Sequence, residues 1–413
     1  MTASEQLAQF AAGSKALPKL CREYKKERAT VHLKELVGGA LSFYAAAAVA
    51  KTGGVHIFVA EDRDAAAYLL NDFYNLLDEK QVYFFPSSYK RSAAYGAEDA
   101  QGVVQRTTAM NAVRGFTKGY LVVCTYPEAL AERVVDAATL QRDTIAVKLG
   151  DKISIAVLED ALADANFTRV DFVYEPGQYS VRGGIVDVFS YSESKPYRID
   201  FFGDEVDSIR RFNISSQLSA DKLDRVEIVP NLNAGEAPRV SFVQFAGSSA
   251  TCWFYDADYV LRRVNDLRRK VLADMEEPGQ IDRLLTSRNV LLRDMAGNSV
   301  VALRDNLPER PATAAVVFDT APQPKFNKNF EMLADDMIRN SLRGYATYIL
   351  SENKVQVERL ENIFHQIGRG QAAVRSLSVT LHEGFVDNDL KLCLYTDHQI
   401  FDRYQRYRIN GEI

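Results

Sequence analysis

The sequence comprises 413 residues, of which 47% are hydrophobic and 25% charged, as in folded globular proteins and unlike disordered or fibrous ones. Its 50 Lys and Arg residues and 55 Asp and Glu residues give a net charge of −5, which excludes a general attraction to nucleic acid. The length suits two to four domains. No run of about 20 apolar residues predicts a membrane helix, and four solitary cysteines exclude a disulfide framework or a CxxC zinc site. We therefore expect a cytoplasmic protein without a membrane partner.

Residues 1–131 alternate between predicted helices and strands. A helix over Leu36–Lys51 ends at a Gly-Gly pair, and a buried strand over Val55–Ala60 follows it. Further strands are predicted at 82–85 and 121–124, with helices at 62–77 and 105–113. This alternation predicts a parallel, doubly wound sheet.

Residues 132–233 have a different pattern. A helix over Ile155–Asn166 precedes short alternating strands punctuated by turn residues, predicted at 169–174, 179–189, 197–202, 206–212 and 225–229. The pattern predicts an α+β module with a mainly antiparallel sheet.

The α/β pattern returns in residues 234–328, with buried strands at 250–255 and 314–319 and a charged helix over Tyr259–Met275. A β-rich block between two α/β segments predicts one split domain with an inserted module. Residues 329–413 predict a small C-terminal α/β domain that ends in a polar, basic linker from Phe401 onward.

The segment Gly38-Gly39-Ala40-Leu41-Ser42 is the only candidate phosphate loop. A P-loop needs a lysine to reach the terminal phosphates, and Leu41 stands in its place. We therefore expect a tight strand-to-helix turn that binds no ATP. The acidic segments at 203–207 and at Asp319 have no phosphate loop to work with, and no residue pattern predicts a catalytic or metal centre.

The run from Arg182 to Arg210 predicts a hairpin with one apolar and one polar face, because side chains alternate along a strand. With the turn near Ser192, Arg182 is predicted to lie opposite Phe202, and all even-numbered positions, including Arg198, to share the polar face. Two arginines around an exposed aromatic ring are typical of a protein-binding hot spot. The alternative, that Phe202 packs under a neighbouring element, fits the residues equally well.

The runs Arg182–Phe189 and Arg198–Phe212 closely resemble the bacterial transcription-repair coupling factors (the Mfd family), in the module that this family shares with the excision-repair protein UvrB. Supporting matches follow in consistent order at 83–86, 106–109, 218–219, 323–327 and 384–387. The resemblance implies a vestigial helicase-like (P-loop NTPase-like) split domain, an inserted module that binds UvrA through Arg182, Arg198 and Phe202, and a small domain after it.

The resemblance also implies that this chain is an N-terminal, non-catalytic scaffold without a cofactor. ATP and magnesium are then expected only in the motor domains of an ATP-dependent DNA translocase, which together with a further domain bind RNA polymerase and double-stranded DNA outside these 413 residues. Two departures from UvrB support this interpretation. Leu41 replaces the phosphate-loop lysine, and the stretch from Pro86 to Tyr120 is too short for a damage-probing hairpin, with only Tyr89 and Tyr95 before its helix.

Two alternatives remain open. The first is a stand-alone ATP-dependent DNA helicase or damage-recognition protein of the UvrB type. The second is weak DNA binding through basic clusters at Lys25–Lys26, Arg262–Arg263 and Arg268–Lys270, although charge runs on helices usually form solvated faces.

Overall fold

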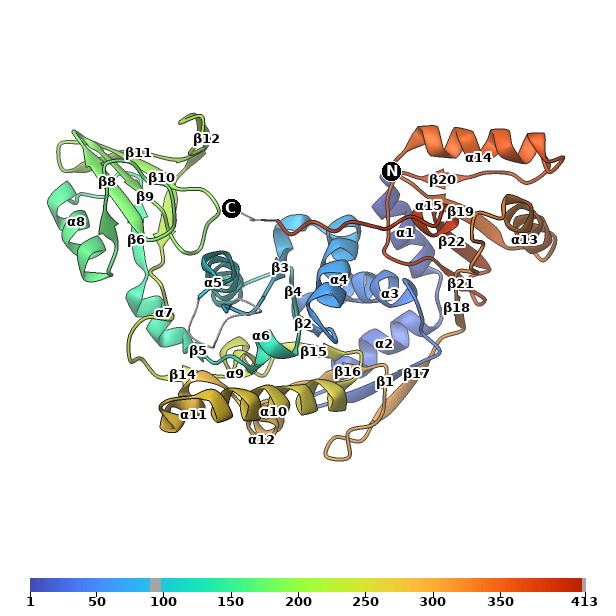
Figure 1. Cartoon of the computed structure of the whole chain (residues 1–413), viewed down its shortest axis with the longest axis horizontal. Helices are drawn as coiled ribbons and strands as arrows, with labels where there is room; N and C mark the ends of the chain where they lie inside the picture. Colours follow the sequence, from blue (N-terminus) through green and yellow to red (C-terminus); the bar gives the residue numbers. More distant parts are fainter. Residues whose placement is uncertain (90–97, 411–413) are drawn as a thin grey trace.

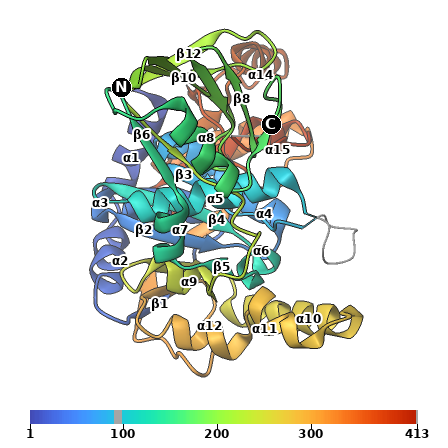
Figure 2. The ribbon, with the colours of Figure 1, turned by 90° about the vertical axis from the view of Figure 1, so that its left-hand side faces the viewer.

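A computed structural model describes residues 1–89 and 98–410 of the chain. Figure 1 shows a central α/β body, a β-rich module in green at one end and a smaller unit in orange and red at the other. Both outer parts rise from the same side of the body (Figures 1 and 2). Within the described residues, no helix combines the length and apolar character needed to cross a membrane.

The body is built on one seven-stranded sheet in which every neighbouring pair is parallel. The order in space is β17 (Ala314–Val317), β1 (Thr30–Lys34), β16 (Val300–Ala302), β15 (Thr251–Phe254), β2 (Gly54–Val59), β4 (Tyr120–Thr125) and β3 (Val82–Phe84). Strand β1 therefore lies between β17 and β16 of the later segment, and β2 lies next to β15, so both segments of the chain build one sheet. Nearly every position of β2 and β4 is buried, as in parallel strands covered on both faces. The predicted α/β fold with a parallel sheet is confirmed, while its P-loop-like ancestry stays a prediction.

The body also contains helices, most of which lie between its strands in the sequence. They are α1 (Ala3–Ala12), α2 (Ala16–Tyr24), α3 (Ala40–Thr52), α4 (Arg63–Leu76), α5 (Ala100–Gly115), α6 (Pro127–Ala131), α9 (Phe242–Ala246), α10 (Ala257–Asp274), α11 (Ile281–Leu284) and α12 (Arg288–Asp294), with 3-10 turns η1 (Glu79–Gln81) and η2 (Pro278–Gln280). Helix α3 begins at Ala40 and not at the predicted Leu36, because Gly38 adopts a left-handed conformation (φ +57°) that ends the preceding turn.

The β-rich module contains a six-stranded sheet and its own hydrophobic core. In spatial order the strands are β12 (Ser219–Leu223), β11 (Glu205–Phe212), β10 (Tyr197–Phe202), β9 (Ile185–Val188), β8 (Gln178–Arg182) and β7 (Thr168–Arg169), and all pairs except β7–β8 are antiparallel. The apolar face of this sheet packs against α8 (Ile155–Asp164) and the ribbon of β6 (Ile145–Lys148) and β13 (Arg225–Ile228). Helix α7 (Ala137–Asp143) and the pair of β5 (Val134–Val135) with β14 (Arg239–Val240) connect the module to the body.

The C-terminal unit carries a five-stranded sheet in the order β18 (Thr320–Pro322), β21 (Phe385–Asp387), β22 (Leu392–Thr396), β19 (Ala346–Leu350) and β20 (Ser376–Leu377). Its helices are α13 (Phe330–Leu342), α14 (Lys354–Gln366) and α15 (Asp397–Ile400). One side of the unit has a separate core, whereas Leu381, Phe385 and Leu394 join the core of the body. The predicted division at residues 131, 233 and 328 stays a prediction.

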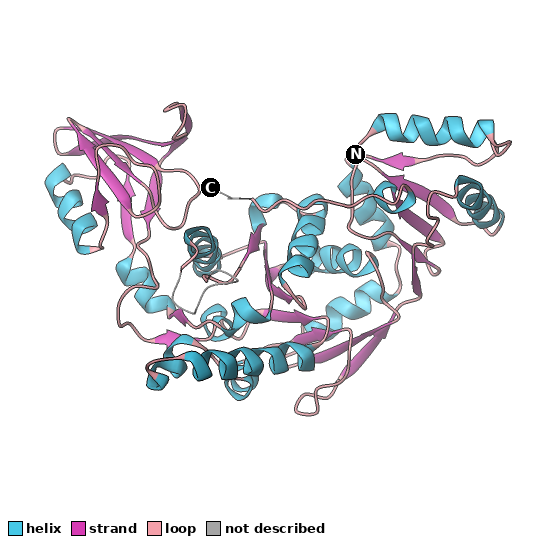
Figure 3. Cartoon of the chain, in the orientation of Figure 1, coloured by secondary structure: helices cyan, strands magenta, loops and turns pink. Residues whose placement is uncertain are grey.

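Residues 401–410, predicted as a linker, form a strap without helix or strand that runs along α4 (Figure 3). Its Ile409 is buried, and the Asn71 and Tyr68 side chains bond its backbone. The segment therefore belongs to the folded body. Of the two tyrosines predicted before α5, Tyr95 lies outside the described residues.

Candidate functional site

The predicted hairpin strand over residues 179–189 is in fact two strands. A turn at Gly183–Gly184, with Gly183 at φ +60°, separates β8 from β9. Arg182 consequently pairs with Ile185, and Phe202 pairs with Glu205, so the prediction that Arg182 lies opposite Phe202 is wrong. The prediction treated residues 179–189 as one strand with a single alternation of faces. Because of the turn, odd-numbered residues of β9 instead share a face with even-numbered residues of β8.

The polar face of the sheet is organised by Asp187, an odd-numbered residue that the predicted parity placed on the other face. Its Oδ2 accepts a hydrogen bond from Arg182 Nη2 at 2.7 Å, and Arg198 binds both carboxylate oxygens, through Nε at 2.8 Å and Nη2 at 2.9 Å. Asp187 is 2% exposed, so its charge depends on these two cations. Arg182 and Arg198 are thus brought together, as predicted, but by a third residue.

Arg198 is less accessible than the predicted hot spot requires. Its side chain is 13% exposed, its guanidinium lies 4.2 Å from the Phe212 ring centroid, and its Nη2 also donates to Gln217 Oε1 at 3.0 Å. The hydrogen bonds to Asp187 raise the pKa of Arg198 above its ordinary value. Arg198 is therefore a fixed cation that shapes this face.

Phe202 is the most exposed aromatic residue of this surface. It lies at the end of β10, next to the turn at Gly203, and 83% of it is accessible to solvent. The alternative that Phe202 packs under a neighbouring element is therefore wrong. Phe172, which is 49% exposed, lies under the Arg182 guanidinium at 4.9 Å. We call this surface, made by Phe172, Arg182, Asp187, Arg198 and Phe202, the hairpin face.

Asp187, Phe172 and Gln217 were missed in the sequence. Only Asp187 gave a usable signal, since it is a lone acid within the apolar run Ile185–Val188. A carboxylate in such a run needs a paired cation, and the nearby arginines could have supplied it.

The turn at residues 36–42 does not present the groups that a phosphate loop presents. Ser42 Oγ donates to Asp72 Oδ2 at 2.7 Å and lies 3.1 Å from the Gly39 carbonyl oxygen, so the hydroxyl is engaged inside the protein. Leu41 contributes only apolar surface. Burial raises the pKa of the Asp72 carboxyl to about 7.

Three backbone N–H groups of this turn are also engaged. Val37 N donates to Thr320 Oγ1 at 3.0 Å, Ala40 N to the Val37 carbonyl at 3.2 Å and Leu41 N to the Gly38 carbonyl at 3.4 Å. A phosphate loop needs such groups directed at its ligand. The tight strand-to-helix turn that the sequence predicted is what the structure contains.

A pocket of about 260 Å³ adjoins this turn at the carboxyl ends of β2 and β15. Its described lining is mostly apolar and includes the carboxyl groups of Glu61, Asp72 and Glu383 but no lysine or arginine. Acidic groups without a lysine or arginine beside them disfavour a polyphosphate.

The remaining candidate residues from the sequence are the acidic segments, possible metal ligands and the basic clusters. The acidic segment at 203–207 forms the turn after β10 and the first residues of β11, and Asp319 Oδ1 accepts from Asn388 Nδ2. Among the described residues, no three His, Cys, Asp or Glu side chains gather as metal ligands. The arginines of α10 pair with acids: Arg262 with Asp258, Arg263 with Glu128, Arg268 with Asp282 and Arg269 with Asp266.

Comparison with known proteins matches the part of the chain that contains the hairpin face to a family model. Residues 145–233, which include the whole hairpin face, match the model of the UvrB interaction domain. The transcription-repair-coupling factors of Bacillus subtilis and Escherichia coli are each 27% identical to this chain over 199 residues, which is 48% of the chain and 17% of either relative. That of Haemophilus influenzae is 35% identical over 101 residues, 24% of the chain and 9% of the relative.

The matched part therefore spans about a sixth of the length of the first two relatives. It also includes about half of this chain, and relatives with the same description occur in several bacteria. The chain is homologous to the bacterial transcription-repair-coupling factors and carries a UvrB interaction domain over residues 145–233.

Proposed function

We propose that this chain is the UvrB-like region of a transcription-repair coupling factor, and that it recruits UvrA to stalled RNA polymerase through the hairpin face. The observation that carries the proposal is an almost fully exposed Phe202 on the polar face of a UvrB interaction domain. An exposed aromatic ring beside ordered arginines is an arrangement that a protein partner can desolvate with a large gain in binding free energy.

Within the proposal the three predicted residues have different roles. Phe202 is the apolar anchor, because it has the largest exposed surface and no fixed partner on the hairpin face. Arg182 is 40% exposed and can form a further contact with an acidic or carbonyl group of UvrA. Arg198 acts through Asp187, whose position it fixes.

We also propose that the chain itself is non-catalytic, needs no cofactor, and works in the cytoplasm. The turn at residues 36–42 supports this, since its hydroxyl and three of its amide groups bond within the protein and its lysine position holds Leu41. ATP and magnesium, double-stranded DNA and RNA polymerase would then be bound by motor and polymerase-binding domains outside these residues. A stand-alone ATP-dependent enzyme of the UvrB type has less support from this geometry.

The decisive experiment is a calorimetric titration of purified UvrA with the Phe202→Ala variant. We expect affinity to fall about 30-fold or more, as for loss of a central aromatic hot spot. Because Phe202 is exposed, circular dichroism and the melting temperature should remain those of the unchanged protein. Val157→Ala is the matched control: Val157 is 58% exposed but lies on α8, on the opposite side of the sheet. Unchanged UvrA affinity in a folded Phe202→Ala protein would refute the proposal.

A further inference from the structure

The turn at residues 36–42 meets the C-terminal unit through a contact between two backbones. A Cβ added at Gly39 would lie 1.9 Å from the Glu383 carbonyl oxygen, and one added at Gly38 would lie 3.0 Å from the Gly384 carbonyl oxygen. Gly384 has no room for a side chain either, because its Cβ would lie 2.5 Å from the Leu394 carbonyl oxygen. Glycines are therefore required on both sides of the contact for steric reasons.

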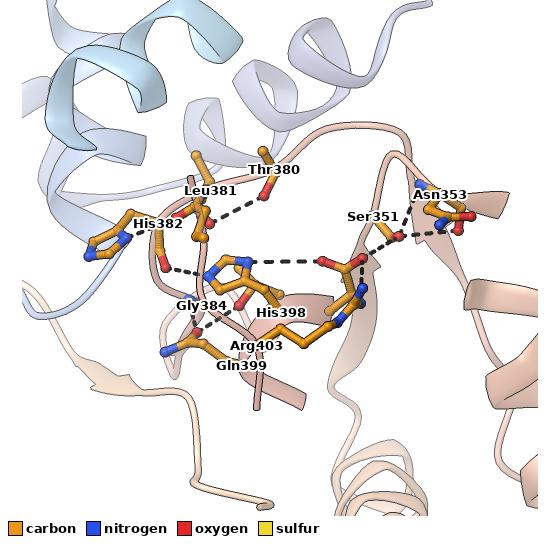
Figure 4. Close-up of polar contacts among 12 residues, drawn as sticks. Ser351, Asn353, Thr380, Leu381, His382, Gly384, His398, Gln399 and Arg403 are labelled. Atoms are coloured by element: carbon orange, nitrogen blue, oxygen red, sulfur yellow. Dashed lines mark hydrogen bonds and ion pairs between the residues drawn. The ribbon is translucent and has the colours of Figure 1, made fainter. Parts of the chain in front are cut away.

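The segment that makes this contact is held in shape by its own unit. His398 Nε2 lies 2.7 Å from the His382 carbonyl oxygen, and Gly384 N donates to Gln399 Oε1 at 2.7 Å (Figure 4). The helix that carries both side chains, α15, is tied to the loop after β19, because Ser351 Oγ donates to Asp397 Oδ2 at 2.7 Å (Figure 4). The segment thus meets the body as a preformed surface.

Several groups of the body hold the same segment along its length. Asn75 Nδ2 donates to the Thr380 carbonyl at 3.0 Å, and the His382 N–H donates to the buried Asp72 carboxyl at 2.8 Å. At the other end the Tyr44 hydroxyl donates to Asp387. Residues 380–387, which we call the docking segment, are therefore fixed at both ends and in the middle.

We propose that the turn at residues 36–42 is a docking surface for the docking segment, which takes the place of a nucleotide and locks the C-terminal unit onto the body. Parallel α/β sheets bind their ligands at the carboxyl ends of the strands, with phosphate at the glycine turn that precedes a helix. Here a peptide backbone of the same chain lies against that turn, and Gly38 and Gly39 serve the contact between backbones.

The chemistry of the surrounding surface agrees with a peptide occupant. The segment meets the turn with its uncharged backbone and brings one carboxylate, Glu383, to this surface, whereas the several charges of a polyphosphate would be repelled by Glu61 and Glu383. Apolar contact also continues past the glycines, since the rings of Phe43 and Phe385 lie 5.2 Å apart. The lock is thus part of the continuous core that joins the unit to the body.

Hydrogen exchange measured on the whole chain by mass spectrometry tests the lock. In Gly39→Ala the new methyl group meets a backbone oxygen that cannot rotate away, so we expect the amides of residues 382–385 to exchange at least tenfold faster. Proteases should also cut more readily between residues 380 and 410. Gly115→Ala is the control, because a Cβ at Gly115, the last residue of α5, meets nothing within 4 Å. Its exchange should match that of the unchanged protein.

Tyr44→Phe covers the case in which Gly39→Ala fails to fold. It removes only the hydroxyl that binds Asp387, so we expect roughly fivefold faster exchange in the docking segment, as for loss of one buried hydrogen bond. Unchanged exchange in a folded Gly39→Ala protein, or in Tyr44→Phe if the first does not fold, would overturn the proposal. Faster exchange of residues 382–385 upon addition of millimolar Mg·ATP to the unchanged protein would also overturn it, since a nucleotide would then compete with the segment.

Discussion

The turn at residues 36–42 and the hairpin face use their polar groups in opposite ways. At the turn, the Ser42 hydroxyl, the Val37 amide and two glycines contact other parts of the chain, and two further amides bond within the turn. On the hairpin face, the internal bonds of Asp187 and Arg198 leave a large aromatic side chain, Phe202, in solvent. The first surface is covered by another part of the same chain, and the second leaves an aromatic ring exposed to solvent.

The comparison shows that a motif alone does not tell whether a site is open. Two glycines and a serine before a helix are the residues of a ligand loop, yet here they make a contact between two parts of the fold. Ion pairs are the usual sign of a surface satisfied within the protein, yet here they order two arginines, and one of them, Arg182, lies over the half-exposed ring of Phe172. The two surfaces differ in the partner that each polar group binds, and a substitution can remove that partner.

The largest expected effect comes from removing the acid that organises the hairpin face. Asp187→Ala leaves Arg198, which is 13% exposed, without its counter-charge, and loss of one partner of such a buried pair costs about 3–5 kcal/mol. We expect the free energy of unfolding, measured by urea denaturation, to fall by about 3 kcal/mol, and UvrA binding to weaken as well. The module should melt before the body, because it has its own core.

Asp200→Ala is the matched control for this variant. Asp200 lies on the next strand and binds Arg210, but it is 24% exposed, against 2% for Asp187. Water can solvate Arg210 after the change, so the loss should stay near 1 kcal/mol. Equal losses for the two variants would show that burial of Asp187 does not set the order of the hairpin face.

The second effect is a dependence of stability on pH that arises from Asp72, next to the turn at residues 36–42. Burial, with a smaller contribution from the charge of Glu383, raises the pKa of Asp72 to about 7 from an ordinary value of 3.8. Between these values the folded state holds a proton that the unfolded state has lost, so stability falls as pH rises from about 4 to 7. The limiting slope is about 1.4 kcal/mol per pH unit. Asp72→Asn should remove this contribution from the pH dependence of urea unfolding.

His382→Ala is the control for the pH effect, since it retains the backbone N–H that Asp72 accepts. The slope between pH 4 and 7 should therefore persist in this variant. A slope that persists in Asp72→Asn as well would assign it to another carboxyl group whose pKa is raised by burial, such as that of Asp387.

The alternation of strands and helices predicted the parallel sheet, because buried strands leave continuous apolar runs that a single sequence displays. The hairpin face was predicted only in part. Arg182, Arg198 and Phe202 were found from the pattern and the family resemblance, but the register was wrong because the Gly183–Gly184 pair could be a turn or a strand interior. The contact of Gly39 with Glu383 joins residues 344 positions apart, and no local pattern encodes such a contact.

The smallest expected effect tests the proposal that the turn at residues 36–42 binds no nucleotide. Leu41→Lys restores the missing cation but leaves the docking segment against Gly39 and the Ser42 hydroxyl on Asp72. We expect no ATP binding in a calorimetric titration and no hydrolysis, with or without DNA, as in the unchanged chain.

The informative control for this change is Leu41→Met, which alters the side chain at the same position without adding charge. If Leu41→Lys binds ATP and Leu41→Met does not, the absent lysine alone separates this turn from a working site, and the docking segment is no obstacle to a nucleotide. If neither variant binds ATP, the glycines of the turn are committed to the C-terminal unit. Restoring nucleotide chemistry would then require removal of the docking segment, which would expose the apolar core that the unit shares with the body.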